Sequence, residues 1–416
     1  MDNHLKIYSK KTKNGLNVQV IPMPKYNQVY GIAMTDFGSV DLTNPNTKEK
    51  LPAGIAHFIE HKLFAKKDYD SSEKFALYGA NANAYTSYTK TAYLFQTLEN
   101  TQANLATLLD LIQNPYFTEE NVEKERGIIK QEVSMYLDMP EWKIEQEILA
   151  KLYPNDPISY DIAGTNQSLD EITKDNLLET YQTFYNQKNM NLVLVGNLDP
   201  DEIFNYVDQN DLLITDGPVI KATLPEKQAV LPGESQVLDI NQSKSTLGIR
   251  IDDKLFENNP IKIQYMLNMI FEILIGESSK LYEELINQRI VNDNFGYNVI
   301  VERGYCFVLV GGDSNNPELL REKLFQQFTS EKFMRMALDT VVERFKREII
   351  GSLIFSQNSP EAIANQQAEL YFYDIDINQL LNIIQSIDKE ELVKLAQNVL
   401  VSENMSYIDL IGRENG

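Results

Sequence analysis

Ala56-His57-Phe58-Ile59-Glu60-His61-Lys62-Leu63-Phe64 is the stretch around which this chain is organised. It contains two of the three histidines in 416 residues, and the two are four positions apart. Because an α-helix turns once every ~3.6 residues, both imidazoles would stand on one face, with Glu60 pointing to the same side. Two neutral imidazoles are good ligands for a divalent ion, above all zinc. A carboxylate beside them can accept a proton from water and pass it to a leaving amine.

The same spacing is also compatible with ordinary histidines of an amphipathic helix, and spacing alone does not separate the two interpretations. The flanking residues Phe58, Ile59, Leu63 and Phe64 predict a largely buried helix. Ionisable groups are costly in such a helix unless they are paired or bound to a metal. The flanks therefore favour a metal site, which needs a third protein ligand from elsewhere in the chain.

Length and composition predict two globular domains of about 200 residues each, because 416 residues exceed one ordinary core. Hydrophobic residues make up 43% and charged residues 24%, which is typical of soluble globular proteins. The net charge of −22 argues against nucleic acid as a partner, because phosphates would be repelled.

Targeting signals are not evident in the sequence. The start of the chain, Met1-Asp2-Asn3-His4-Leu5-Lys6, has no apolar core, and no run approaches the ~18 apolar residues that cross a bilayer. No membrane association is therefore expected. Cys306 is the single cysteine, which excludes an internal disulfide and fits a reducing cytosol. We expect a cytoplasmic protein.

A second helix is expected to begin near Thr118, where 118–121 resembles a capped, acidic first turn. Glu125 and Glu132 on it are seven residues apart, so two turns return them to one face. Metal ligation by one carboxylate and support by the other would explain their place on an apolar face. The alternative, a solvated charge run, suits Glu119 better than Glu132. The 70 residues between His61 and Glu132 can bring this helix back beside the first.

The first half otherwise alternates strand and helix patterns. Asn14-Gly15 predicts the tight turn of a hairpin. Strand patterns occupy 16–22, 29–34, 82–88, 91–97 and 189–197, and helical patterns occupy 74–79 and 104–113.

His57-x-x-Glu60-His61, followed about 70 residues later by a Glu125-to-Glu132 segment of sequence Glu-Arg-Gly-Ile-Ile-Lys-Gln-Glu, resembles the insulinase/pitrilysin family of inverzincin metallopeptidases. It is most similar to short bacterial members related to mitochondrial processing peptidase, over nearly the whole chain. The resemblance implies that His57, His61 and Glu132 bind one Zn²⁺ per chain. It also implies two catalytic carboxylates: Glu60 as the general base, and Glu125 as the carboxylate that supports the metal ligands from behind.

Asn83-Ala84-Tyr85-Thr86 is similar to the family's edge strand beside the metal. In that family an extended substrate adds to the strand through main-chain hydrogen bonds. The resemblance therefore implies that Asn83, Ala84, Tyr85 and Thr86 bind substrate. The alternative is simple pairing within the sheet.

The second half repeats the pattern of the first, which indicates one duplicated module. Its strands are expected at 245–251, 305–310 and 405–412, its helical region 261–289 lacks histidine, and Phe328-Thr329-Ser330-Glu331 is expected to open a further helical region. Residues rich in Pro and Gly mark a linker. We expect a catalytic zinc-binding module at 1–215, a linker at 216–236 and a homologous module without a metal site at 237–416.

The expected fold class is α+β, with a mainly antiparallel β-sheet and helices packed on one face in each module. This is the LuxS- and processing-peptidase-like metallohydrolase fold that the resemblance implies.

One departure from the family concerns the second module, which usually carries an Arg shortly before a Tyr, both reaching the substrate. Ile286 stands where that Arg is common, and 292–294 form an insertion before Tyr297. Arg289 is a less favoured substitute. The preferred hypothesis is that a homologous subunit supplies the pair, in a heterodimer with a zinc-less partner or in a homodimer that encloses a chamber.

The implied activity is zinc-dependent hydrolysis of short or unfolded peptides in that chamber. Two alternatives stay open. The first alternative is a dedicated maturation protease that removes the leader of a ribosomally made peptide. The second is a non-catalytic structural subunit of a peptidase pair. The intact set of His57, Glu60, His61 and Glu132 argues against the structural subunit.

Overall fold

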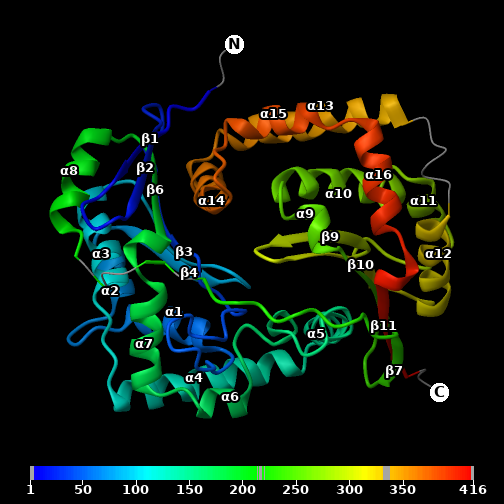
Figure 1. Ribbon diagram of the computed structural model, residues 1–416, viewed down its shortest axis with the longest axis horizontal. Helices are drawn as coiled ribbons and strands as arrows, with labels where there is room; N and C mark the ends of the chain where they lie inside the picture. The colour runs from blue at the N-terminus through cyan, green and yellow to red at the C-terminus, as the bar shows by residue number, and fades with distance from the viewer. Residues whose placement is uncertain (1–3, 213, 215–217, 220, 331–337, 414–416) are drawn as a thin grey trace. The chain divides into compact units, whose positions relative to one another are not determined.

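The chain folds into two compact units (Figure 1). The computed structural model describes residues 4–212, 214, 218–219, 221–330 and 338–413. Unit 1 comprises Met1–Val133, Asp161–Leu224 and Ser352–Leu381, and unit 2 comprises Ser134–Tyr160, Pro225–Gly351 and Asn382–Gly416. Each unit therefore contains a segment from the other half of the sequence.

Unit 1 is built on a mixed β-sheet. Among the described residues the strand order is β1-β2-β6-β3-β5-β4, in which β2 and β6 are parallel and all other neighbours are antiparallel. The β1–β2 hairpin turns at Asn14-Gly15 as predicted, because Gly15 takes up the left-handed φ of 98°. The strands are β1 (Tyr8–Lys11), β2 (Asn17–Pro22), β3 (Val29–Thr35), β4 (Ala80–Thr86), β5 (Thr91–Thr97) and β6 (Met190–Gly196).

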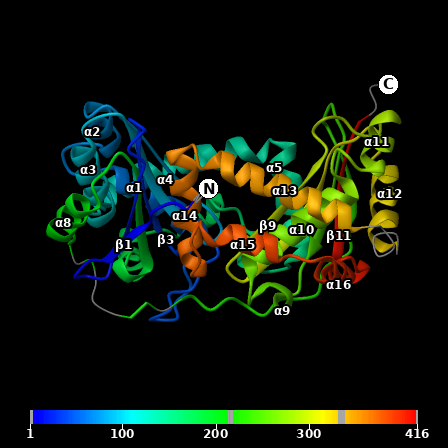
Figure 2. The same ribbon diagram turned by 90° about the horizontal axis from the view of Figure 1, so that it is seen from above.

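Helices cover both faces of this sheet. One face packs on α1, α3 and α7 around a large apolar core, and α14 covers the other face at β3 and β6 (Figures 1 and 2). The helices are α1 (Ile55–Phe64), α2 (Ser71–Leu77), α3 (Thr101–Gln113), α6 (Asn166–Asp170), α7 (Lys174–Phe184), α8 (Pro200–Asn210) and α14 (Pro360–Leu370). Three helices cross between the units: α4 (Glu119–Leu137), α13 (Leu338–Ser356) and α15 (Gln379–Ser386).

Polar side chains fix the position of α14 on its sheet. The Gln367 side chain of α14 is buried and donates to the Gln19 side chain of β2 at 3.4 Å. The same Gln19 oxygen accepts from Asn191 at 3.3 Å, and Asn191 in turn accepts from Asn17 at 2.7 Å. A buried polar network is stable only when its members are paired, so it specifies one position for the helix.

Unit 2 has the same sheet topology. Among the described residues its strand order is β7-β11-β8-β10-β9, with β7 and β11 parallel and the other pairs antiparallel. This order matches β2-β6-β3-β5-β4 of unit 1. The strands are β7 (Glu234–Leu238), β8 (Lys244–Arg250), β9 (Gly296–Glu302), β10 (Tyr305–Asp313) and β11 (Met405–Gly412).

The helix α5 comes from the first half of the sequence and packs on the sheet of unit 2. Ile148 and Leu152 of α5 approach β8 so closely that a Cβ at Gly248 would lie 2.8 Å from each. Figure 1 shows α5 and α10 on opposite sides of β9 and β10. The remaining helices are α5 (Pro140–Leu152), α9 (Asp253–Phe256), α10 (Pro260–Ile275), α11 (Lys280–Asn287), α12 (Pro317–Thr329) and α16 (Lys389–Val399).

The predicted duplication and α+β architecture are confirmed, and the structure adds two features. First, each sheet carries a helix on its second face, α14 in unit 1 and α5 in unit 2, whereas the sequence predicted helices on one face. Second, strand β7 begins at Glu234, inside the predicted linker. Phe328 and Thr329 end α12, and the Glu331 of that prediction lies outside the described residues. Within those residues, no helix combines the length and apolar character needed to cross a membrane.

Helix α1 starts at a backbone position that requires glycine. Gly54 precedes the helix with a left-handed φ of 89°, and a Cβ there would lie 2.5 Å from the Ala163 carbonyl oxygen. At Gly127, in the middle of α4, an added Cβ would meet no atom within 4 Å outside the backbone of its own helix.

We therefore expect Gly54→Ala to lower the free energy of unfolding by about 2 kcal/mol or more, because it adds both backbone strain and a clash with main chain. Gly127→Ala is the control and should raise stability by up to about 1 kcal/mol, because alanine favours the helix. Denaturant unfolding of the two variants measures both values. Equal stability of the variants would contradict the role of Gly54.

Candidate metal centre

Helix α1 divides its residues between the core and a polar flank. Phe58, Ile59 and Leu63 are fully buried against the sheet and α3. His57 and His61 lie on the flank, one turn apart, with ring centroids separated by 4.5 Å. The packing of one side of α1 against the core therefore fixes the position of the two imidazoles on its polar flank.

Helix α4 brings the two predicted glutamates to this flank. Val122, Ile129 and Val133 are its buried residues. Glu125 and Glu132 each follow one of these positions by three residues, so they project beside the buried stripe. Both carboxylates reach the imidazoles of α1.

Three side chains converge with the geometry of a metal site. His57, His61 and Glu132 each offer a ligand atom, and these atoms all lie within 4.8 Å of one another. The His57 Nε2–Glu132 Oε1 distance is 3.9 Å and the His61 Nε2–Glu132 Oε2 distance is 3.7 Å. Ligands of a tetrahedral zinc ion lie about 3.3 Å apart, since each bond is about 2.0–2.2 Å. The atoms are thus too far apart for hydrogen bonds, but their separations are close to those of ligands that share one metal ion.

The environment of His57 favours a neutral ring. Burial, followed by the nearby His61, lowers the pKa of His57 to about 4. Its Nδ1 atom is buried without a hydrogen-bond partner among the described residues. A neutral imidazole whose Nε2 faces Glu132 is in the protonation state that a metal ion requires.

Glu125 joins His61 to a buried lysine. Its Oε1 atom lies 3.2 Å from His61 Nδ1, and its Oε2 atom lies 3.4 Å from Lys62 Nζ. Burial opposes ionisation of Glu125, but the hydrogen bond with His61 and the charge of Lys62 outweigh it and lower the pKa of the carboxyl. When Nδ1 of His61 donates to this carboxylate, Nε2 keeps its lone pair for a ligand bond.

Glu60 points to the same side of α1 but is held from a different element. Its Oε2 atom accepts a hydrogen bond of 2.6 Å from the Thr86 hydroxyl, at the end of β4. Burial raises the pKa of Glu60, and the Thr86 hydrogen bond opposes this effect. The carboxylate is therefore fixed by the sheet and remains outside the group of three ligand atoms.

Comparison with known proteins agrees with this arrangement. Residues 47–166 match the family profile described as insulinase (peptidase family M16), and residues 171–332 match the one described as the M16 inactive domain. The chain is 35% identical to the uncharacterized zinc protease YmfH of Bacillus subtilis, over 97% of this chain and 96% of that protein. This chain belongs to peptidase family M16.

Solved structures share the M16 fold. An M16-like peptidase from Alicyclobacillus acidocaldarius is 28% identical and superimposes with a TM-score of 0.93, covering 98% of this chain and 99% of that one. The periplasmic protease PqqL of Escherichia coli is 17% identical, with a TM-score of 0.74 over all of this chain and 48% of that chain. The predicted family and fold class are confirmed.

The residues predicted to bind substrate lie on β4, the last strand of its sheet within the described residues. Asn83 and Tyr85 are exposed, and Ala84 is half-buried. The structure adds a function for Thr86, since its hydroxyl holds Glu60.

Arg289, the less favoured substitute for the family's arginine, and Tyr297 lie in unit 2. The Tyr297 hydroxyl donates to the Glu272 carboxylate at 3.0 Å, so this side chain is bonded within its own unit. Arg289 is exposed and takes a left-handed φ of 55°.

Lys62 is the residue of this M16 site that the sequence analysis missed. Its side chain is only 2% exposed. The available signal was a lysine beside His61 on a helix with apolar flanks, where a buried cation requires an anion.

The Lys62–Glu125 pair should contribute to stability as a unit. Glu125→Gln leaves a buried ammonium without its anion, so we expect the free energy of unfolding of the metal-free chain to fall by about 2–4 kcal/mol. Adding Lys62→Met, of similar volume, should recover about 1–3 kcal/mol of this loss. Denaturant unfolding of wild type, both single variants and the double variant measures the coupling. Additive losses would show that the two charges are not coupled.

Proposed function

We propose that this member of family M16 is a zinc-dependent endopeptidase that hydrolyses short or unfolded peptides. The observation that carries the proposal is the convergence of the His57, His61 and Glu132 ligand atoms within 4.8 Å, with the carboxylate of Glu60 on the same face of α1. Two imidazoles and one carboxylate are a donor set of catalytic zinc sites, which keep one position open.

The donor set fits zinc better than a harder ion. Magnesium and calcium prefer shells of oxygen ligands, whereas imidazole suits zinc. Burial lowers the pKa of His57 and favours its neutral ring. Burial also opposes protonation of His61, but the hydrogen bond with Glu125 and the nearby carboxylates outweigh it and raise the pKa of His61, so a metal ion that binds its Nε2 atom would compete with a proton. A bound zinc ion would supply Lewis acidity and make a water molecule more acidic.

Glu60 would move the proton in this reaction. Its free oxygen, the one not bonded to Thr86, accepts the proton of the attacking water and then returns it to the leaving amine. Thr86 holds the carboxylate at one position while it does so. Glu125 stays with His61 and Lys62 and keeps the ligand ring oriented.

The edge strand β4 would bind the substrate as an additional strand. It ends at Thr86, beside Glu60, so a peptide paired along β4 passes the proposed base. Main-chain pairing gives affinity with little dependence on sequence and requires an extended, unfolded chain.

The proposed enzyme works with a homologous subunit that lacks the metal site, or as a homodimer. PqqL supports this part of the proposal. The fold of the present chain covers 48% of the PqqL chain, so PqqL is long enough to contain two such folds. The isoleucine at position 286, where the family often has Arg, also favours a second subunit. A cytoplasmic location stays a prediction based on the single cysteine.

Replacing Glu60 separates catalysis from metal binding. Glu60→Gln should retain zinc but lower kcat by at least about 10³-fold, because the amide cannot accept the proton. His61→Ala and Glu132→Ala should lose both zinc and activity. Glu120→Gln, on the exposed first turn of α4, is the matched control and should behave as wild type. Metal analysis and cleavage of a fluorogenic peptide are the measurements.

Near-normal turnover by Glu60→Gln would rule out the proposed base. Wild-type chain that binds no zinc would rule out the metal site itself.

Strand addition on β4 predicts how changes to the substrate backbone act. Methylation of one peptide amide that pairs with β4 should lower kcat/KM about tenfold, because one main-chain hydrogen bond is lost. The control is the same peptide methylated at the neighbouring residue, whose amide points away in an extended strand. Steady-state kinetics on a series methylated at successive positions should show an alternating pattern. A uniform or absent effect would exclude strand addition.

A further inference from the structure

We propose that Arg126 and Lys130 are positioning residues, which hold α4 at the rotation that the metal centre needs. They act through residues 165–172, which include the short helix α6. The inference rests on the proposed zinc site.

Helix α4 has little apolar anchorage for a helix that carries two site residues. Of its 19 residues, only Val122, Ile129 and Val133 are buried. Apolar groups such as Ile128 and Met135 are 45% and 65% exposed and therefore add little packing. A stripe of three valine or isoleucine side chains resists rotation about the helix axis weakly, so polar contacts must determine the angle.

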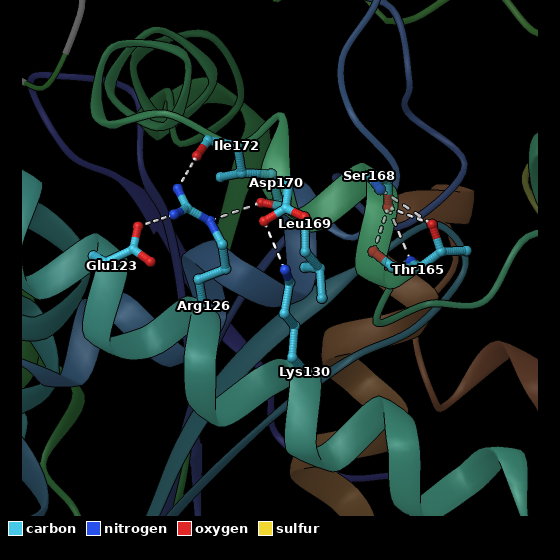
Figure 3. Close-up of polar contacts among 8 residues, drawn as sticks. All are labelled: Glu123, Arg126, Lys130, Thr165, Ser168, Leu169, Asp170 and Ile172. Atoms are coloured by element: carbon cyan, nitrogen blue, oxygen red, sulfur yellow. Dashed lines mark hydrogen bonds and ion pairs between the residues drawn. The ribbon is translucent and has the colours of Figure 1, made fainter.

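Arg126 donates two hydrogen bonds to main-chain carbonyls at and just beyond the end of α6 (Figure 3). Its Nε atom donates to the Leu169 carbonyl at 3.0 Å and its Nη2 atom donates to the Ile172 carbonyl at 2.7 Å. The guanidinium also pairs with Glu123 on its own helix. The Leu169 carbonyl also accepts the backbone N–H of Ile172 at 3.2 Å, and Ile172 itself lies two residues beyond α6. The planar guanidinium binds both carbonyls and so has one fixed orientation.

Lys130 makes a second contact one turn further along α4. Its Nζ atom lies 2.6 Å from the Asp170 carboxylate (Figure 3). Two contacts separated by four residues, or about 6 Å along the axis, fix both the rotation and the height of the helix. Arg126 directly follows Glu125, and Lys130 precedes Glu132 by two residues.

The same segment is attached to the start of α1. The Ser168 hydroxyl donates to the Ala53 carbonyl at 2.8 Å, next to the Gly54 that begins the helix. A Cβ at Gly164 would lie 2.5 Å from the same carbonyl oxygen, so the two backbones are in close contact. Leu169 is fully buried in the core. Residues 165–172 therefore connect the helix of the histidines to the helix of the glutamates.

A small rotation of α4 would disturb the proposed ligands. Side-chain ends lie about 6 Å from a helix axis, so a rotation of ~10° moves the Glu132 carboxylate by about 1 Å. Metal–ligand distances tolerate about 0.2 Å. A support that limits rotation is thus needed for metal affinity, in addition to any effect on folding.

The test compares Arg126→Gln with Arg126→Lys, which keeps the charge and one donor, in the full-length chain. Lys174→Gln is the matched control, because Lys174 pairs with Glu119 of the same α4 at 3.4 Å but at the exposed first turn. The measurements are the zinc dissociation constant, by competition with a chelator, and the visible absorption spectrum with Co²⁺ in place of zinc. The spectrum reports ligand geometry, which a purely stabilising contact would leave unchanged.

Arg126→Gln should weaken zinc binding about 10- to 100-fold and change the Co²⁺ spectrum. Arg126→Lys should lie between Arg126→Gln and wild type, and Lys174→Gln should match wild type in both measurements. Wild-type affinity and spectrum in a folded Arg126→Gln chain would overturn the proposal. If circular dichroism shows that this variant is unfolded, Lys130→Gln and Asp170→Asn serve instead, and unchanged spectra in both would overturn it. Wild-type chain that binds neither ion would refute the zinc site itself.

Discussion

The hydrogen bonds of Glu125 with His61 and Lys62 are the interaction on which the site depends, because they give the half-buried His61 and the buried Lys62 of α1 a common partner. Burial of α1 is needed to hold its histidines in place, yet the same burial removes Lys62 and Glu60 from water. Each ionisable group must then find a partner on another element. Helix α4 supplies the partner of Lys62, and β4 supplies the Thr86 hydroxyl for Glu60. The ionisable groups of α1 therefore link the positions of α1, α4 and β4.

The sequence was sufficient for features that depend on side-chain spacing. The helical interval from His57 to His61 and the seven-residue interval from Glu125 to Glu132 predict which groups share a face, and the structure brings these groups together. Two features had no such signal. The apolar face of α5 does not reveal which of two similar sheets it covers. The carbonyls that Arg126 binds belong to the main chain, and any residue provides them.

Duplication explains why the fold does not require the site. Helix α10 of unit 2 lies between β8 and β9, after the short helix α9, as α1 lies between β3 and β4, and its buried residues are all Ile, Leu, Met or Phe. Such a helix packs without partners for buried charge, so unit 2 is stable as an apolar version of the same topology. In unit 1 the corresponding helix carries Glu60, His61 and Lys62 at a cost in desolvation. This cost brings no gain in packing, so packing alone does not account for these three residues.

The arrangement of charge also favours a divalent ion over a monovalent one. Glu60, Glu125 and Glu132 bring three carboxyl groups to one flank of α1, and the cation Lys62 contacts one of them, Glu125. With all three ionised, the set has a formal charge of −2, which one doubly charged ion would neutralise. Because Lys62 faces Glu125 and lies behind the ligand atoms, its charge balances the supporting carboxylate without occupying the position between His57, His61 and Glu132.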